Sequence, residues 1–143
     1  GCSFNSQRAF SDIGVVNHLA KRGAISPGSE LFGYAFENWV FHEISIHSKY
    51  SEQFYDISYW QLSSGIEVDF VLSDAQTAVE VKGKERITSN DLKGLRHFKQ
   101  EYPNVKNRIV VCLENQIRRN EEGIWILPYR DFLINLWNNE WTV

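Results

Sequence analysis

Two stretches near the middle of the chain alternate between apolar and polar residues. The first is Ile66-Glu67-Val68-Asp69-Phe70-Val71-Leu72, and the second is Ala78-Val79-Glu80-Val81-Lys82. Such alternation indicates β-strands, because successive side chains of a strand point to opposite faces of the sheet. Residues 73–76 between the two stretches form a short turn. The pattern therefore predicts an antiparallel hairpin with one apolar face and one polar face.

The four-residue turn fixes the expected register of this hairpin. We expect three facing pairs, which are Leu72 with Thr77, Asp69 with Glu80 and Glu67 with Lys82. The apolar face then carries Ile66, Val68, Phe70, Leu72, Val79 and Val81. The polar face carries Glu67, Asp69, Glu80 and Lys82.

The facing carboxylates of Asp69 and Glu80 need an explanation. Opposed Cβ atoms in a hairpin are about 5 Å apart, and like charges at that distance are destabilising. A bound divalent cation, Mg²⁺ or Mn²⁺, would neutralise them. The alternative is an ordinary solvent-exposed sheet face, on which Glu, Asp and Lys are common. Spacing alone favours this alternative, because short acidic patterns match by chance.

The rest of the chain predicts helices and strands around this hairpin. An apolar run at 108–113 indicates a strand buried on both faces, and residues 115–123 a polar loop. The residues Thr88–Asp91 have the chemistry of a helix N-cap. In chain order we expect a helix over 31–48, strands over 53–62, 66–72 and 78–82, a helix over about 91–102, strands over 108–113 and 124–127, and a helix over 131–138.

Composition narrows the class of protein. With 143 residues, 43% of them hydrophobic, the chain is long and apolar enough for one folded domain with a buried core. Its net charge of −3 gives no overall attraction for nucleic acid or for an anionic membrane, so phosphate binding requires a metal or a local basic patch. No apolar run approaches the length of about 18 residues that spans a membrane. Cys2 and Cys112 indicate free thiols and a cytoplasmic protein.

The start of the chain indicates a piece of a larger protein. The chain has no Met and begins with Gly1. We expect residues 1–28 to be an irregular entry with one short helix over 12–20, continuing from an upstream region. Residues 29–143 would then form the domain itself.

Glu37 is a carboxylate on an otherwise apolar stripe of the first long helix. Positions 37, 40, 41 and 44 are neighbours on one helix face, and the other three are Val40, Phe41 and Ile44. A buried carboxylate must find a partner or shift its pKa. The alternative is that Glu37 lies at the edge of the stripe and reaches solvent. We expect the aromatic residues of this helix to belong to the core rather than to a stacking platform.

Taken together, Glu37, Asp69 and the sequence Glu80-Val81-Lys82 resemble the motif of the PD-(D/E)xK nuclease superfamily. Segments 65–72 and 79–83 look more closely like one prokaryotic branch of unknown function, which forms the C-terminal part of AAA+ family ATPases. Segments 10–14, 36–40 and 91–95 also look like that branch. Val68 stands where the superfamily name places Pro.

The resemblance implies a fold and an activity. The fold would be a restriction-endonuclease-like mixed α/β core of order α-β-β-β-α-β. Asp69 and Glu80, with Glu37, would bind Mg²⁺ or Mn²⁺, and Lys82 would complete a catalytic set for phosphodiester hydrolysis. Glu67 would be either a further ligand or the ion-pair partner of Lys82. ATP would act only through an upstream ATPase domain, since the nucleotide-binding motif G-x-x-x-x-G-K-[ST] does not occur in these residues.

Four basic residues suggest a weak nucleic-acid track. Lys84 and Arg86 follow the hairpin, and Lys93 and Arg96 lie on the next predicted helix. Such residues contact phosphates and fix position rather than sequence. For Lys93 and Arg96 taken by themselves, a solvated charged helix face is the better explanation. Two function classes remain open. One is a metal-dependent nuclease domain, and the other is a catalytically inactive docking or regulatory domain of an ATPase.

Overall fold

The computed structural model describes residues 29–142, and these form one mixed α/β fold. The short helix expected over 12–20 and Cys2 lie outside the described residues. The elements are α2 (Glu30–Tyr50), β1 (Ile57–Gln61), β2 (Glu67–Leu72), β3 (Thr77–Val81), the 3₁₀ helix η1 (Ser89–Leu92), α3 (Lys93–Glu101), β4 (Asn107–Cys112), β5 (Arg118–Arg119), β6 (Trp125–Pro128) and α4 (Tyr129–Trp137).

The six strands form one mixed sheet of order β1-β2-β3-β4-β6-β5. The pairs β1–β2 and β2–β3 are antiparallel, whereas the pairs β3–β4 and β4–β6 are parallel. The mixed α/β architecture and the order of its long elements were predicted from the sequence. The expected polar loop at 115–123 is wrong in part, because Arg118 and Arg119 pair with β6 as a short antiparallel edge strand.

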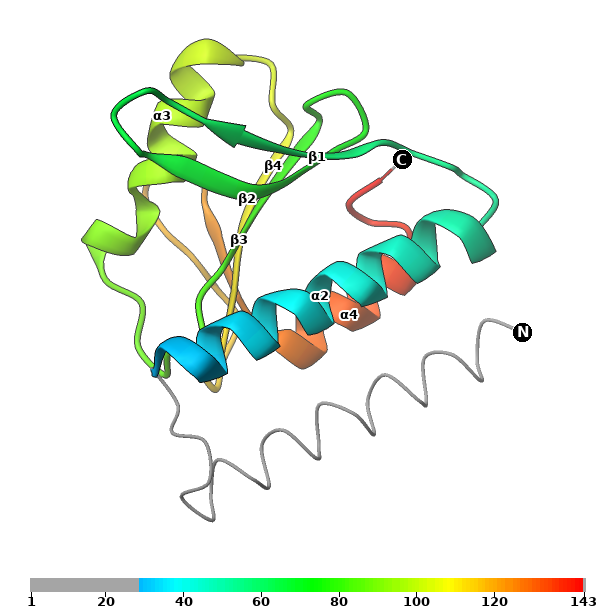
Figure 1. The fold of residues 1–143 in the computed structure, drawn as a ribbon, viewed down its shortest axis with the longest axis horizontal. Helices are drawn as coiled ribbons and strands as arrows, with labels where there is room; N and C mark the ends of the chain where they lie inside the picture. The colour runs from blue at the N-terminus through cyan, green and yellow to red at the C-terminus, as the bar shows by residue number, and fades with distance from the viewer. Residues whose placement is uncertain (1–28, 143) are drawn as a thin grey trace.

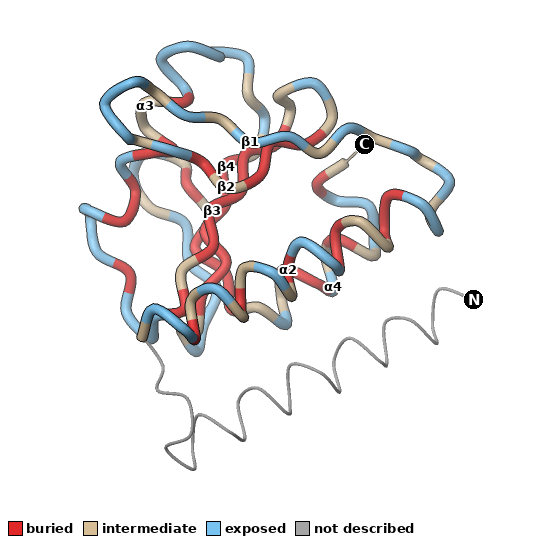
Figure 2. Tube along the Cα trace, viewed as in Figure 1, coloured by how far each residue is buried: buried red, intermediate tan, exposed pale blue. Residues whose placement is uncertain are grey.

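Two hydrophobic cores lie on the two faces of the sheet (Figure 1). α2 and α4 lie side by side against one face, and α3 covers the other. Figure 2 shows the central strands buried almost throughout, as the continuous apolar run of β4 predicts. The core between α2, α4 and the sheet contains Phe32, Phe36, Val40, Ile44, Phe70, Leu72, Val79 and Val81 among others.

α2 begins where Ser29 caps the backbone, since its hydroxyl accepts a hydrogen bond from the Phe32 N–H at 3.2 Å. Its buried stripe is Phe32, Phe36, Val40, Ile44 and His47, spaced by four, four, four and three residues. The expected stripe through Glu37 is therefore displaced by one position. Glu37 lies beside the buried stripe rather than on it.

The hairpin of β2 and β3 has the predicted register. Leu72 faces Thr77 and Phe70 faces Val79. The 73–76 turn is closed by hydrogen bonds from the Gln76 N–H to the carbonyls of Leu72 and Ser73. Continued by one pair, this register places Asp69 opposite Glu80.

The expected alternation along β2 is wrong at one point. Between Ser58 and Trp60 the register of β1 against β2 shifts by one residue. Asp69 and Phe70 therefore share one partner position, which makes a β-bulge. As a result Phe70 packs into the core under α2, whereas Val68 packs into the core under α3. Ile66 is only half-buried.

Two further predictions concern the thiol of Cys112 and membrane-spanning helices. Cys112 is a buried free thiol, as predicted, and burial raises its pKa. Among the helices formed by residues 29–142, none combines the length and apolarity that crossing a bilayer requires.

Candidate functional site

Asp69 occupies the bulge of β2 and connects two strands through its side chain. Its Oδ2 accepts a hydrogen bond from the backbone N–H of Val81 at 2.7 Å. A bulge disrupts the ladder and can re-aim a side chain. Here the carboxylate takes a place next to the end of β3, where the chain leaves the hairpin toward Lys82.

The side chain of Glu80, near the end of β3, contacts the Asp69 carboxylate. Glu80 lies between Val79 and Val81, whose side chains pack under α2, so Glu80 points toward α3. The residue is 4% exposed and shares a hydrogen bond with Asp69. Burial, this hydrogen bond and the Asp69 charge together raise the pKa of Glu80 from 4.5 to about 10, against the lowering effect of Lys82. The pair therefore holds a proton at neutral pH, in line with the predicted repulsion between the two carboxylates.

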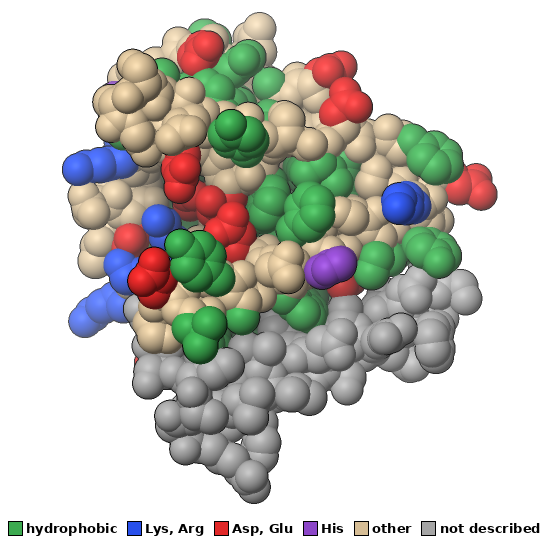
Figure 3. Space-filling view, viewed as in Figure 1, with side chains coloured by type: hydrophobic (Ala, Val, Ile, Leu, Met, Phe, Trp, Pro, Cys, Tyr) green, Lys and Arg blue, Asp and Glu red, His purple; other side chains and the backbone are tan. Residues whose placement is uncertain are grey.

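Glu37 approaches the same group from α2. It is half-buried, and burial followed by the charges of Asp69 and Glu67 raises its pKa, while Lys82 lowers it. These are the same three charged residues that act on Glu80. Figure 3 shows acidic side chains gathered between the hairpin and the N-terminal half of α2, with basic side chains beside them. We call Glu37, Glu67, Asp69, Glu80 and Lys82 the carboxylate cluster.

Lys82 is the one cation of the cluster. It is half-buried directly after β3, where its N–H donates to the Val111 carbonyl at 2.9 Å. Its charge lowers the pKa of both Glu37 and Glu80. Within the described part of the chain, no carboxylate lies at ion-pair distance from its Nζ. Glu67 is exposed at the start of β2 and acts on the cluster through its charge.

The donor set suits one class of metal. Within residues 29–142, no three His, Cys, Asp or Glu side chains form a preformed metal cage. Mg²⁺ rarely needs such a cage, because it keeps several waters and is held by one or two carboxylates plus substrate phosphates. The Asp69–Glu80 pair offers two hard oxygen donors that share a proton, and a divalent cation would replace that proton. The residues present therefore fit Mg²⁺ or Mn²⁺.

Gly94 of α3 allows the helix to lie directly against this site. A Cβ atom at Gly94 would come within 2.1 Å of the Glu67 carbonyl oxygen and 3.0 Å of Glu80 Oε2. The first contact is with backbone, so it could be relieved only by moving the helix or the strand. The sequence interpretation assigned Gly94 no role in the site, although a glycine inside a predicted helix is the signal for such a close approach.

A family model described as a domain of unknown function, DUF4143, matches residues 32–132. The chain belongs to the DUF4143 family. The matched span includes every residue of the carboxylate cluster. No curated protein and no solved structure shows significant similarity to the chain.

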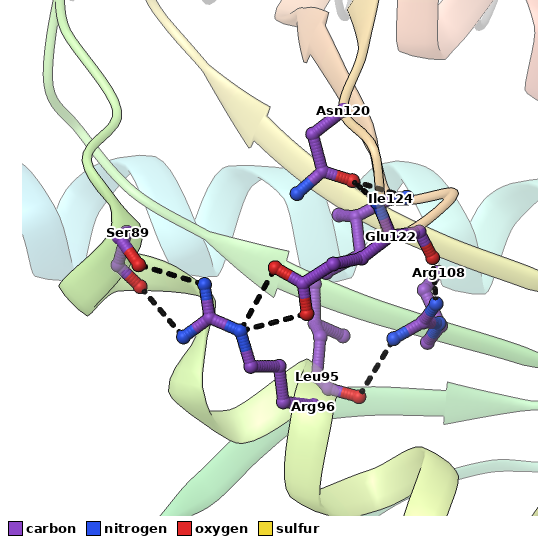
Figure 4. Close-up of polar contacts among 7 residues, drawn as sticks. All are labelled: Ser89, Leu95, Arg96, Arg108, Asn120, Glu122 and Ile124. Atoms are coloured by element: carbon purple, nitrogen blue, oxygen red, sulfur yellow. Dashed lines mark hydrogen bonds and ion pairs between the residues drawn. The ribbon is translucent and has the colours of Figure 1, made fainter.

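In this DUF4143 domain, the four basic residues expected to contact nucleic acid have different environments. Lys84 Nζ forms an ion pair with Asp91 at 2.9 Å. Arg96 is held by Glu122 at 2.7 Å and by the Ser89 hydroxyl at 2.7 Å (Figure 4). Figure 4 also shows Arg108 held by the carbonyls of Leu95 and Glu122. Arg86 and Lys93 are exposed. Two of the four predicted phosphate contacts are thus engaged within the protein.

Proposed function

We propose that the DUF4143 domain binds Mg²⁺ or Mn²⁺ at Asp69 and Glu80 and hydrolyses phosphodiester bonds of nucleic acid. The observation that carries this proposal is the buried Asp69–Glu80 pair, in which burial, the shared hydrogen bond and the Asp69 charge raise the pKa of Glu80 to about 10, so that the pair keeps a proton at neutral pH. Lys82 two residues further along completes the set that resembles the nuclease motif.

The roles of the residues follow from their positions. Asp69 and Glu80 would bind the ion. Glu37 would bind one of the water molecules on the ion, since the charges of Asp69, Glu67 and Lys82 all act on its carboxylate. When bound, such an ion lowers the pKa of water and polarises a phosphoryl oxygen. Lys82 would orient the attacking water or stabilise negative charge on the phosphate. Glu67 would add negative charge beside the ion, as it does in raising the pKa of Glu37 and Glu80.

Thermal melting of wild type and Asp69→Asn, with excess chelator and with excess Mg²⁺ or Mn²⁺, tests the metal site. Asn keeps an oxygen that accepts the Val81 N–H bond but removes the charge that opposes Glu80. We expect the metal-free variant to melt at or above the wild-type temperature, and only wild type to gain stability from metal. Asp56→Asn, an exposed carboxylate outside the cluster, is the matched control and should respond as wild type does. Equal gains by wild type and Asp69→Asn, or no gain by wild type, would falsify the metal site.

Cleavage of labelled single- and double-stranded DNA and RNA with Mn²⁺ or Mg²⁺ tests the activity. We expect Lys82→Ala to keep the metal-induced gain in melting temperature and to lose cleavage, because Lys82 acts on the reaction rather than on the ion. Wild type that binds metal but leaves every substrate intact would support the second class of function instead. That class is a catalytically inactive docking or regulatory domain, and the internal ion pairs of Lys84 and Arg96 favour it.

We also propose that this domain works beside an ATPase domain of the same polypeptide. The support is the sequence resemblance to the C-terminal part of AAA+ family ATPases. Any effect of ATP would then arise in that upstream domain. A nucleotide-binding measurement on the 143-residue chain should therefore detect no binding. Tight ATP binding by this chain alone would contradict the proposal that ATP acts only in the upstream domain.

A further inference from the structure

An open groove runs along the outer side of α2, directly beside the carboxylate cluster. Its volume is about 600 Å³, and Glu37 forms part of its wall. The groove and the cluster therefore have one side chain in common. The rest of the wall is mostly apolar and is formed by Leu31, Tyr34, Ala35, Asn38, Phe41 and Phe70.

Two aromatic side chains that α2 contributes to this groove, Tyr34 and Phe41, are exposed, contrary to the sequence prediction that the aromatic residues of the helix belong to the core. Tyr34 is 64% exposed and Phe41 is 41% exposed. They lie seven residues apart and hence on one helix face. Phe41 stacks on Phe70, with ring centroids 5.7 Å apart and planes inclined by 28°. Since Phe70 directly follows Asp69, this stacked pair forms a fixed aromatic platform next to the carboxylates.

We propose that the groove binds an unpaired nucleobase of a single-stranded nucleic acid whose phosphate lies at the Asp69–Glu80 pair. This inference rests on the proposed function and names its substrate class. Every base has a face that stacks on aromatic side chains, whatever the sequence. In a duplex those faces are covered by neighbouring bases, so a base must be unpaired to reach Tyr34 and Phe41. With a net charge of −3, the protein has no overall attraction for a polyanion, and stacking supplies affinity that charge does not.

Fluorescence anisotropy with three labelled probes tests the groove. The probes are a short oligothymidylate, an abasic oligomer of the same length and a duplex, each measured in Ca²⁺ and in chelator. We expect Tyr34→Ala to weaken binding of oligothymidylate by roughly 5- to 150-fold, the range for loss of one stacked base. Binding of the abasic oligomer should not change. Tyr34→Phe keeps the ring and should bind as wild type does. Tyr59→Ala removes an equally exposed aromatic residue (71%) from β1 and is the matched control.

Several results would overturn the inference. These are wild-type affinity in Tyr34→Ala, preference of wild type for the duplex, or no binding of oligothymidylate in either buffer. Sedimentation of both proteins adds a further outcome, because a Tyr34→Ala variant that changes only its oligomeric state would assign the groove to a second copy of the chain. The proposed function fails separately. If metal does not raise the melting temperature but binding in chelator still depends on Tyr34, the metal site is wrong and the groove stands.

Discussion

At the scale of single residues, Glu80 has the most unusual environment of the cluster. Burial and the Asp69 carboxylate both favour its protonated form, and Lys82 alone opposes them. A glutamate in the unfolded chain would be ionised at neutral pH. Folding therefore requires the uptake of a proton at this position, and that uptake costs free energy that increases with pH. A cation that replaces the proton removes this cost.

Glu80→Gln should therefore stabilise the metal-free protein. The amide has the shape of the protonated acid and donates a hydrogen bond to Asp69 without having to bind a proton. We expect the free energy of unfolding at pH 8 in chelator to rise by on the order of 2–4 kcal/mol. Urea unfolding measures it. Glu85→Gln, at an exposed position after the hairpin, is the control and should change little. A destabilised Glu80→Gln protein would mean that Glu80 is ionised when folded.

At the scale of the elements, the hairpin shows what local sequence determines. Alternation and turn length predicted the pairing of β2 with β3, because both depend on residues close together in the chain. The bulge at Asp69 was missed, since it arises from the pairing of β2 with β1 and no glycine marks it. The exposure of the aromatic residues on the outer face of α2 also depends on packing between distant segments, so the sequence pattern alone places these residues in the core. Periodicity identifies a helix but does not identify which of two apolar stripes the sheet covers.

Gly94→Ala tests the close approach of α3 to the site. Alanine favours helix formation by roughly 1 kcal/mol over glycine, but here its Cβ would overlap the Glu67 carbonyl. We expect a net loss of about 1–3 kcal/mol in the free energy of unfolding, as for other overpacked positions, and a weaker response to metal. Gly33→Ala in α2 is the matched control. Nothing lies within 4 Å of the added Cβ there, so it should stabilise the protein. Equal effects of the two substitutions on the free energy of unfolding would contradict the predicted overlap between a Cβ at position 94 and the Glu67 carbonyl.

The start of η1 depends on Asp91 in a comparable way. Its Oδ2 accepts hydrogen bonds from the Thr88 N–H at 2.9 Å and the Thr88 hydroxyl at 3.1 Å, and the carboxylate also pairs with Lys84. We expect Asp91→Ala to lower the free energy of unfolding by about 1–3 kcal/mol through loss of the cap and of a buried acceptor. Asp91→Asn keeps the acceptor and should lose less. Thermal or urea unfolding distinguishes the two, and equal losses would assign the effect to the charge alone.

At the scale of the whole molecule, contacts between segments far apart in sequence determine features that the local pattern of residues does not predict. The class of fold was predictable, since strand and helix periods are local. The ion pair of Arg96 was not, because its partner Glu122 lies 26 residues away. His47 is another example. It is fully buried on α2, and its ring nitrogens lie 2.8 Å from the Tyr55 hydroxyl and 2.9 Å from Asn139 Oδ1. It thus ties α2 to the segment before β1 and to the segment after α4.

His47 and Glu80 should give the metal-free protein two opposing responses to pH. The folded pKa of Glu80 is raised, so its contribution is present at low pH and is lost as pH rises toward about 10. The folded pKa of His47 is lowered, mainly by burial and against the effect of its Asn139 hydrogen bond. Its contribution is therefore present above pH 6.5 and is lost as pH falls below that value.

We expect the free energy of unfolding in chelator to rise by up to about 1.4 kcal/mol per unit as pH falls from 8 to 6.5, and to level off below 6.5 as His47 begins to oppose Glu80. Urea unfolding at a series of pH values measures both limbs. Glu80→Gln should abolish the upper limb and leave a stability that only decreases below pH 6.5. With excess Mg²⁺ the upper limb should be lost or reversed for wild type, since the cation competes with the proton at Asp69 and Glu80. An upper limb that persists in Glu80→Gln would show that another group takes up the proton.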